Sequence, residues 1–168
     1  MEKIFFLIFI SFCHAAQAEN HLYRVIQTPP NEFIYALKAQ SVSISEPKTA
    51  DSRLQKFFKL SSKKVTDSDI EMKVQAKADM LPAALIKHTG FTIRLHELKG
   101  GAPHVFRTEF IFGADMGIEG LMKISAFEQA TLIEFDVQHT TVPLWLLDKA
   151  IQIIFKLNLA SATPKNTK

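Results

Sequence analysis

The stretch TLIEFDVQHTTVPLWLLDKAIQIIFKLNL, residues 131–159, changes its hydrophobic period partway along. Its first part alternates apolar and polar side chains, with Ile133 and Phe135 on one side, which is typical of a half-buried strand. From Val142 the apolar residues recur every three or four positions, as they do in a helix. Pro143 suits the first turn of that helix, because an N–H there has no partner to lose. The stretch therefore predicts a last strand followed by a C-terminal helix.

The predicted helix, residues 142–159, is apolar around most of its circumference. Its polar residues form one narrow stripe: Asp148, Lys149, Gln152 and Lys156. The wide apolar arc contains Leu144, Leu147, Ala150, Ile151, Ile154, Phe155 and Leu157. A helix of about 17 residues is roughly 25 Å long, which matches the width of five or six strands about 4.8 Å apart. We expect it to cover a sheet, either as an ordinary core helix or as one wall of a cavity. A helix lying on a membrane would need a more basic polar stripe.

Four earlier segments show the same alternation as the last strand. They are DIEMKVQAKADM (69–80), GFTIRLHEL (90–98), HVFRTEFIF (104–112) and GLMKISAF (120–127). Short polar or glycine-containing links join the five strands, which predicts an antiparallel meander with one apolar face and one solvent-facing face. We expect the glycines at 113, 117 and 120 to allow a bend or bulge. If the strands are neighbours, Arg107 can pair with Glu134 or Asp136 across the solvent-facing side.

The first third of the chain after residue 18 is more ambiguous. HLYRVIQT (21–28) reads as a short strand, and NEFIYALKAQ (31–40) as a helix with Asn31 as its N-cap. The stretch 32–45 can also be read as one strand. TADSRLQKFFKLSS (49–62) has the apolar spacing of a short amphipathic helix.

Residues 1–18, MEKIFFLIFISFCHAAQA, have the features of a secretory signal peptide. Lys3 precedes a short apolar run, and Ala16 and Ala18 form an A-x-A cleavage pattern before Glu19. We therefore expect a protein exported to the periplasm or beyond, with one globular domain at 19–160 and a flexible tail at 161–168. The one cysteine of the chain, Cys13, lies in the signal, so the exported part has none for a disulfide.

The composition and motifs exclude several function classes. The net charge of +3 is spread along the chain and does not form the basic cluster of a nucleic-acid-binding protein. The histidines lack metal-ligand spacing, no G-x-S-x-G is present, and the segment GADMGIEG (113–120) lacks the spacing of a phosphate loop. We therefore predict no metal, no cofactor and no membrane-spanning segment after the signal, and the sequence favours binding over catalysis. It gives no oligomeric state.

Two segments resemble the START and polyketide-cyclase-like superfamily, which also contains the Bet v 1-like proteins. YRVIQTPPNEFIYALK (23–38) is similar to the first strand, proline-containing turn and helix of that group. GLMKISAFEQATLIEFDV (120–137) followed by VPLWLLDKAIQIIF (142–155) is similar to its last hairpin and long helix. The chain departs from many relatives at Ala130, where they have Gly before Thr, and residues 40–65 do not map onto the pattern.

The resemblance implies an α+β helix-grip fold, in which a curved antiparallel sheet of about five to seven strands holds a long C-terminal helix. Members mostly bind lipids or other apolar molecules between sheet and helix, and a minority are cyclases or hydrolases. The expected function is therefore binding of an apolar, lipid-like ligand. The residues expected to line its site are Phe106, Phe110, Phe112, Ile133, Phe135, Leu147, Ile151 and Phe155. The alternatives are an enzyme with an inward-facing general base, or a module whose last helix meets a protein partner.

Overall fold

The computed structural model describes residues 20–40, 57–77 and 90–162. In chain order the elements are β1 (His21–Ile26), α2 (Pro30–Lys38), β2 (Phe58–Val65), β3 (Asp69–Ala76), β4 (Gly90–Lys99), β5 (His104–Ile111), β6 (Gly117–Phe127), β7 (Ala130–Thr140) and α5 (Leu144–Ala162). The predicted signal peptide and tail, and the ends of several predicted segments, lie outside the described residues.

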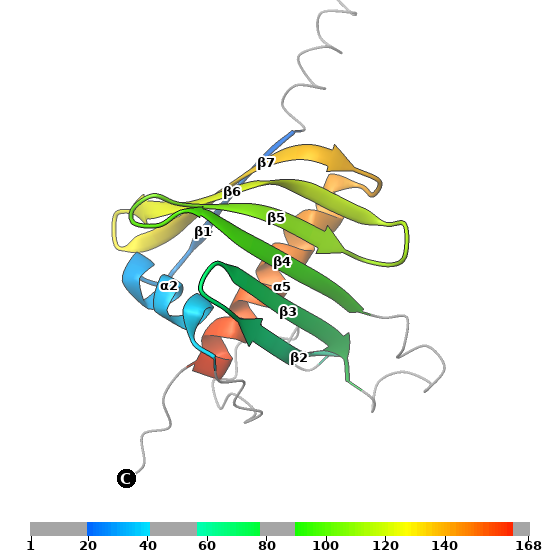
Figure 1. Ribbon diagram of the computed structural model, residues 1–168, viewed down its shortest axis with the longest axis horizontal. Helices are drawn as coiled ribbons and strands as arrows, with labels where there is room; N and C mark the ends of the chain where they lie inside the picture. The colour runs from blue at the N-terminus through cyan, green and yellow to red at the C-terminus, as the bar shows by residue number, and fades with distance from the viewer. Residues whose placement is uncertain (1–19, 41–56, 78–89, 163–168) are drawn as a thin grey trace, which may run out of the picture.

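The strands form one antiparallel sheet in the order β1-β7-β6-β5-β4-β3-β2 (Figure 1). Strands β2 to β7 follow each other as a meander, and β1 pairs with β7 at the far edge. The five alternating segments are confirmed as β3 to β7, and the predicted α+β sheet with a C-terminal helix is confirmed. In β1, Leu22 and Ile26 pack against the core, whereas Val25 is 43% exposed on the other side.

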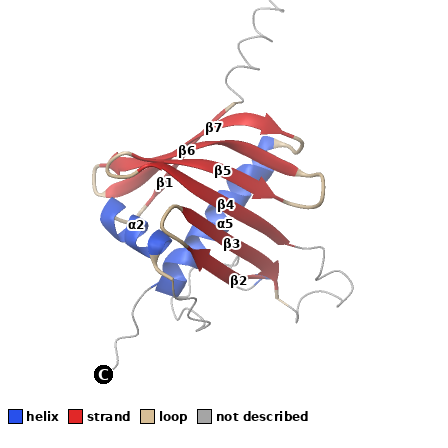
Figure 2. Cartoon of the chain, viewed as in Figure 1, coloured by secondary structure: helices blue, strands red, loops and turns tan. Residues whose placement is uncertain are grey.

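Helix α5 crosses one face of the sheet, with α2 beside its C-terminal part (Figure 2). The apolar arc of α5 faces the strands, and Leu147, Ile151, Ile154 and Phe155 are each 0% exposed. Phe33 of α2 contacts Phe155, with ring centroids 5.1 Å apart. Each large buried apolar side chain contributes about 1.5–3 kcal/mol, so the packing of α5 against the sheet strongly favours the folded state.

The polar stripe of α5 also has a structural role. Asp148 accepts two hydrogen bonds from the guanidinium of Arg24 in β1. Gln152 donates a further bond to the Asp148 carboxylate, at 3.2 Å. Because β1 is the edge strand beside β7, this ion pair fastens the helix to one edge of the sheet.

The helix predicted over 49–62 is wrong for residues 58–62, because Phe58–Val65 is strand β2. Phe58 pairs with Ala76 and Leu60 with Val74, so β2 completes the free edge of β3. The apolar residues of this segment fit the spacing of a helix or of a strand. The strand forms because its backbone can pair with the edge of β3, which would otherwise have no partner. Residues 49–56 lie outside the description.

Helix α2 begins one residue earlier than predicted. Pro29 is the N-cap, Pro30 is in the first turn, and no side chain caps the helix, so the prediction of Asn31 as N-cap is wrong. The Phe33 N–H donates to the Pro29 carbonyl at 3.0 Å. Proline fits the first turn because its missing N–H would have no partner there. The alternative prediction of a single strand over 32–45 is wrong for residues 32–38, which belong to α2.

The predicted pairing of Arg107 with Glu134 or Asp136 is also wrong. Arg107 lies on β5 and the two carboxylates lie on β7, and β6 separates these strands. Glu134 instead pairs with Lys123 of β6, with Nζ and Oε2 2.8 Å apart. Cross-strand ion pairs need adjacent strands, and a meander makes consecutive strands adjacent.

Gly120 lies where the predicted irregularity occurs, because the β6–β7 register shifts between Glu119 and Gly120. A Cβ added to Gly120 would lie 2.1 Å from the backbone oxygen of Asp136 and 2.8 Å from the Phe135 ring. The two strands approach so closely here that only hydrogen fits on the Cα.

We predict that Gly120→Ala lowers the free energy of unfolding by about 1–3 kcal/mol, because the backbones must move apart to admit a methyl group. Gly113→Ala is the control, since its new Cβ would meet only the flexible end of Met116 at 3.1 Å. Urea denaturation followed by circular dichroism measures both. Equal stability of the two variants would contradict the prediction.

Candidate functional site

The inner face of the sheet, under α5, is the candidate site. Seven of the eight expected ligand contacts lie in one buried cluster here and are at most 1% exposed: Phe106, Phe110, Ile133, Phe135, Leu147, Ile151 and Phe155. The eighth, Phe112, follows the end of β5 and is half-buried against the same cluster. The structure thus brings all eight together, and their role as ligand contacts stays a prediction. Since other side chains cover the seven, a ligand among them must displace neighbours.

A row of phenylalanine rings joins this interior to the end of the sheet. The ring centroids are 5.9 Å apart between Phe135 and Phe110, and 6.5 Å between Phe110 and Phe112. Phe112 is in turn 5.7 Å from Phe91 of β4. The row therefore runs from the fully buried centre to the partly exposed Phe112, along a path of apolar surface.

The exposed end of this row lies near the start of α5. Ile111 pairs with Gly117 at the end of β5, and the Thr141 N–H donates to the Gly117 carbonyl at 3.0 Å. Leu144, in the first turn of α5, is only partly buried against the core. The N-terminal end of the helix and Phe112 thus form the less covered end of the interior.

Two methionines make the interior adaptable. Met72 pairs with Ile93 on the inner face, and Met122 pairs with Phe106 and Phe135 of its two neighbouring strands. Both methionines are 0% exposed. Methionine is unbranched and has several rotatable bonds, so its side chain changes conformation more readily than that of a branched residue when the space around it changes.

The charged residue Lys63 also faces the inner side of the sheet, and sequence reasoning missed it. The β2–β3 register shifts between Leu60 and Ser62, so one extra residue enters β2. Lys63 is consequently opposite Met72, whose side chain is fully buried. Directly paired residues point to the same face of a sheet. Without the shift, the alternation that starts at Leu60 would turn Lys64 inward instead.

The Lys63 ammonium connects three elements. Its Nζ donates to the backbone oxygen of Ala36 in α2 and to Oδ1 of Asn158 in α5, each at 2.6 Å. Asn158 is 0% exposed. Burial lowers the pKa of Lys63 from 10.5 to about 8, because the charged form loses water. Because it contacts a carbonyl in the last turn of α2, the Lys63 ammonium also suits the partial negative charge at that helix C-terminus.

The other polar groups lie mostly outside this interior. His21, His96 and His139 are exposed, and His104 contacts Glu97 at 3.2 Å beside Lys38. Burial alone would raise the pKa of Glu97, but hydrogen bonds from Lys38 and His104 outweigh it and lower the pKa. Within the described ranges, no group of three His, Cys, Asp or Glu side chains could hold a metal ion.

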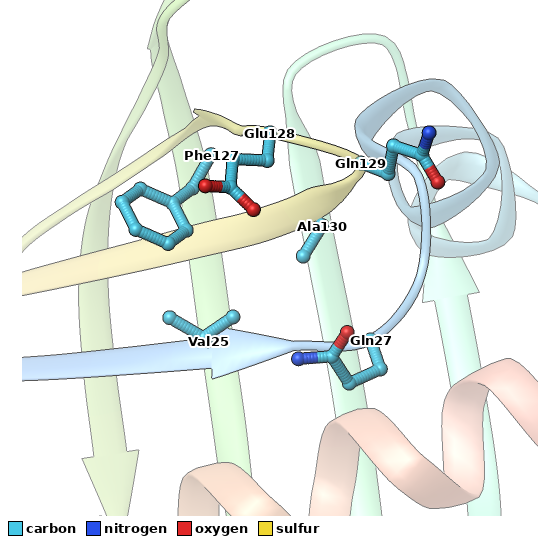
Figure 3. A pocket seen from close by; sticks show the side chains of 6 residues that line it. All are labelled: Val25, Gln27, Phe127, Glu128, Gln129 and Ala130. Carbon is cyan, nitrogen blue, oxygen red and sulfur yellow. The ribbon is translucent and has the colours of Figure 1, made fainter.

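Two cavities formed by described residues lie elsewhere on the surface. One, of about 350 Å³, lies beside the hairpin that joins β6 to β7 and is lined by Val25, Gln27, Phe127, Glu128, Gln129 and Ala130 (Figure 3). The other, of about 370 Å³, has a charged lining that includes Glu71, Arg94 and Glu109. Arg94 already pairs with both carboxylates of that lining, at 3.0 and 3.3 Å. Neither cavity combines enclosure with an apolar lining.

No protein-family model matches the chain, and no curated protein matches its sequence. Among solved structures it is similar to Ara h 8.0201, with a TM-score of 0.50 and 14% identity over 84% of this chain and 95% of that one. An AHSA1-like protein from Aeromonas hydrophila also has a TM-score of 0.50, with 12% identity over 83% of this chain and 90% of that one. These similarities show that the chain shares the fold of these solved structures, in which a curved antiparallel sheet packs against a long C-terminal helix. Within the described residues, no helix is long and apolar enough to cross a membrane.

We predict a pH dependence of stability from Lys63. Its pKa is about 8 in the folded protein and near 10.5 when unfolded, so the unfolded chain binds more protons between these values. The free energy of unfolding therefore rises with pH across this window. Urea denaturation of the wild type and of Lys63→Gln, at a pH below 8 and at one near 10.5, measures the rise as a difference between the two proteins.

Lys64→Gln is the matched control, because Lys64 is an exposed neighbour on the same strand. It should keep the pH-dependent rise that Lys63→Gln loses. A rise of equal size in all three proteins would show that Lys63 titrates as an ordinary surface lysine.

Proposed function

We propose that this protein is exported and binds an apolar, lipid-like ligand between its sheet and α5. The observation that carries the proposal is the row of phenylalanine rings, which leads from the buried centre at Phe135 and Phe110 to the partly exposed Phe112. A ligand entering at Phe112 would follow apolar surface throughout. Met72 and Met122 would move to make room for it.

Two further observations support this proposal. The chain shares its fold with Ara h 8.0201 and the AHSA1-like protein. Its resemblance to the START and Bet v 1-like superfamily, whose members mostly bind apolar molecules, favours a binding role by analogy of fold alone. The features of residues 1–18 support export, because they match a cleavable secretory signal.

The interaction-module alternative is less well supported. Its binding surface would be the apolar arc of α5, but Leu147, Ala150, Ile151 and Phe155 are buried against the rest of the fold. Trp145 is the large apolar side chain of α5 that is strongly exposed, at 65%. A single exposed side chain does not make a contiguous apolar patch.

We predict that the protein binds the neutral dye Nile red and that Phe112→Glu weakens this binding about tenfold or more, because a carboxylate would enter the apolar path. Dye fluorescence measures the affinity. Trp145, the one tryptophan of the chain, lies in the first turn of α5 and reports the same event by energy transfer to the dye.

Phe127→Glu is the control, because Phe127 is 50% exposed and lies at the opposite end of β6. Circular dichroism confirms that both variants are folded. Native mass spectrometry of the protein purified from its own host should show a lipid-sized adduct on the wild type. Absence of both dye binding and an adduct, or equal loss in the two variants, would overturn the proposal.

A further inference from the structure

The interior under α5 contains an ammonium group whose partners are neutral. Both oxygens that accept from Lys63, the Ala36 carbonyl and the Asn158 amide oxygen, are uncharged. They satisfy two of the three donors of the ammonium but cancel none of its charge. An apolar interior therefore has a positively charged group at its β2 edge.

Lys63 is aligned with the phenylalanine row across the sheet. The paired residues on the inner face run from Lys63 through Met72 and Ile93 to Phe110. Three strand spacings of about 4.8 Å place the two ends roughly 14 Å apart. This distance is comparable with the length of a medium alkyl chain. The sheet thus has a cation at one end of a straight apolar track.

We propose that Lys63 binds the carboxylate head of a single-chain amphiphile, such as a fatty acid, whose tail lies along Met72 and Ile93 toward Phe110. This inference rests on the proposed function and names its ligand class. A lysine presents one compact charge, which suits a monoanion, whereas phosphate heads more often meet several donors or an arginine fork.

The lowered pKa of Lys63 agrees with this assignment. Burial destabilises the ammonium in the free protein, and an adjacent carboxylate would restore the lost charge stabilisation. A purely structural role is the competing explanation, since the same ammonium ties the last turn of α2 to α5. The two explanations differ in whether Lys63 discriminates between an anionic and a neutral ligand.

The test compares dodecanoate with dodecanol, which share the same tail, on the full protein near neutral pH. The wild type should bind dodecanoate about tenfold more tightly or better. Lys63→Gln can still donate hydrogen bonds but carries no charge, and it should bind the two ligands equally. Lys63→Arg should keep part of the preference. Lys64→Gln is the control and should keep all of it. Displacement of Nile red measures each affinity, and circular dichroism checks the fold.

The outcomes separate this inference from the proposed function. If neither ligand binds the wild type, the proposed function itself fails. If the wild type binds both equally, or if Lys63→Gln keeps the preference, the role of Lys63 is overturned and the apolar site stands. Tighter binding of dodecyl phosphate than of dodecanoate would overturn the carboxylate assignment.

Discussion

The apolar face of the seven-stranded sheet must be covered, and α5 is the element that covers it. A strand alternates its side chains between two faces, so six hairpin-connected strands place all their inward residues on one continuous surface. Water contact with that surface would cost far more than the fold's net stability. The wide apolar arc of α5, its ion pair with Arg24, and the packing of Phe33 against Phe155 all follow from this need.

Two irregularities in the strand pairing modify that simple picture. The one at Gly120 brings β6 and β7 unusually close. After the shift between Leu60 and Ser62, the residues of β2 that would have faced outward face inward instead. This places Lys63 on the side of the sheet that α5 covers. A bulge changes which residues face inward without changing the strand order. The bulge in β2 therefore places a charged group at the edge of a largely apolar interior.

Core packing and the proposed ligand binding would use the same side chains in this fold. Phe110 and Phe135 stabilise the protein by burial, and they also form the apolar path that a ligand would follow. A site of this kind cannot be recognised from apolar residues alone, because a filled core and a binding cavity have the same composition. The proposal of a binding site therefore rests on other groups: the partly covered Phe112, the unbranched methionines and the inward-facing Lys63.

The sequence by itself determined the strands β3 to β7, the helix α5 and the identity of the buried side chains, because these depend on local periodicity. The inward residues of β5 and β7 and the apolar arc around Ile151 could all be read in this way. Only the tertiary structure decided that Phe58–Val65 is a strand, that Arg107 and Glu134 lie on strands separated by a third, and that Lys63 faces inward. Each of these depends on which strand lies alongside and in what register, and that choice is made by contacts between segments distant in the sequence.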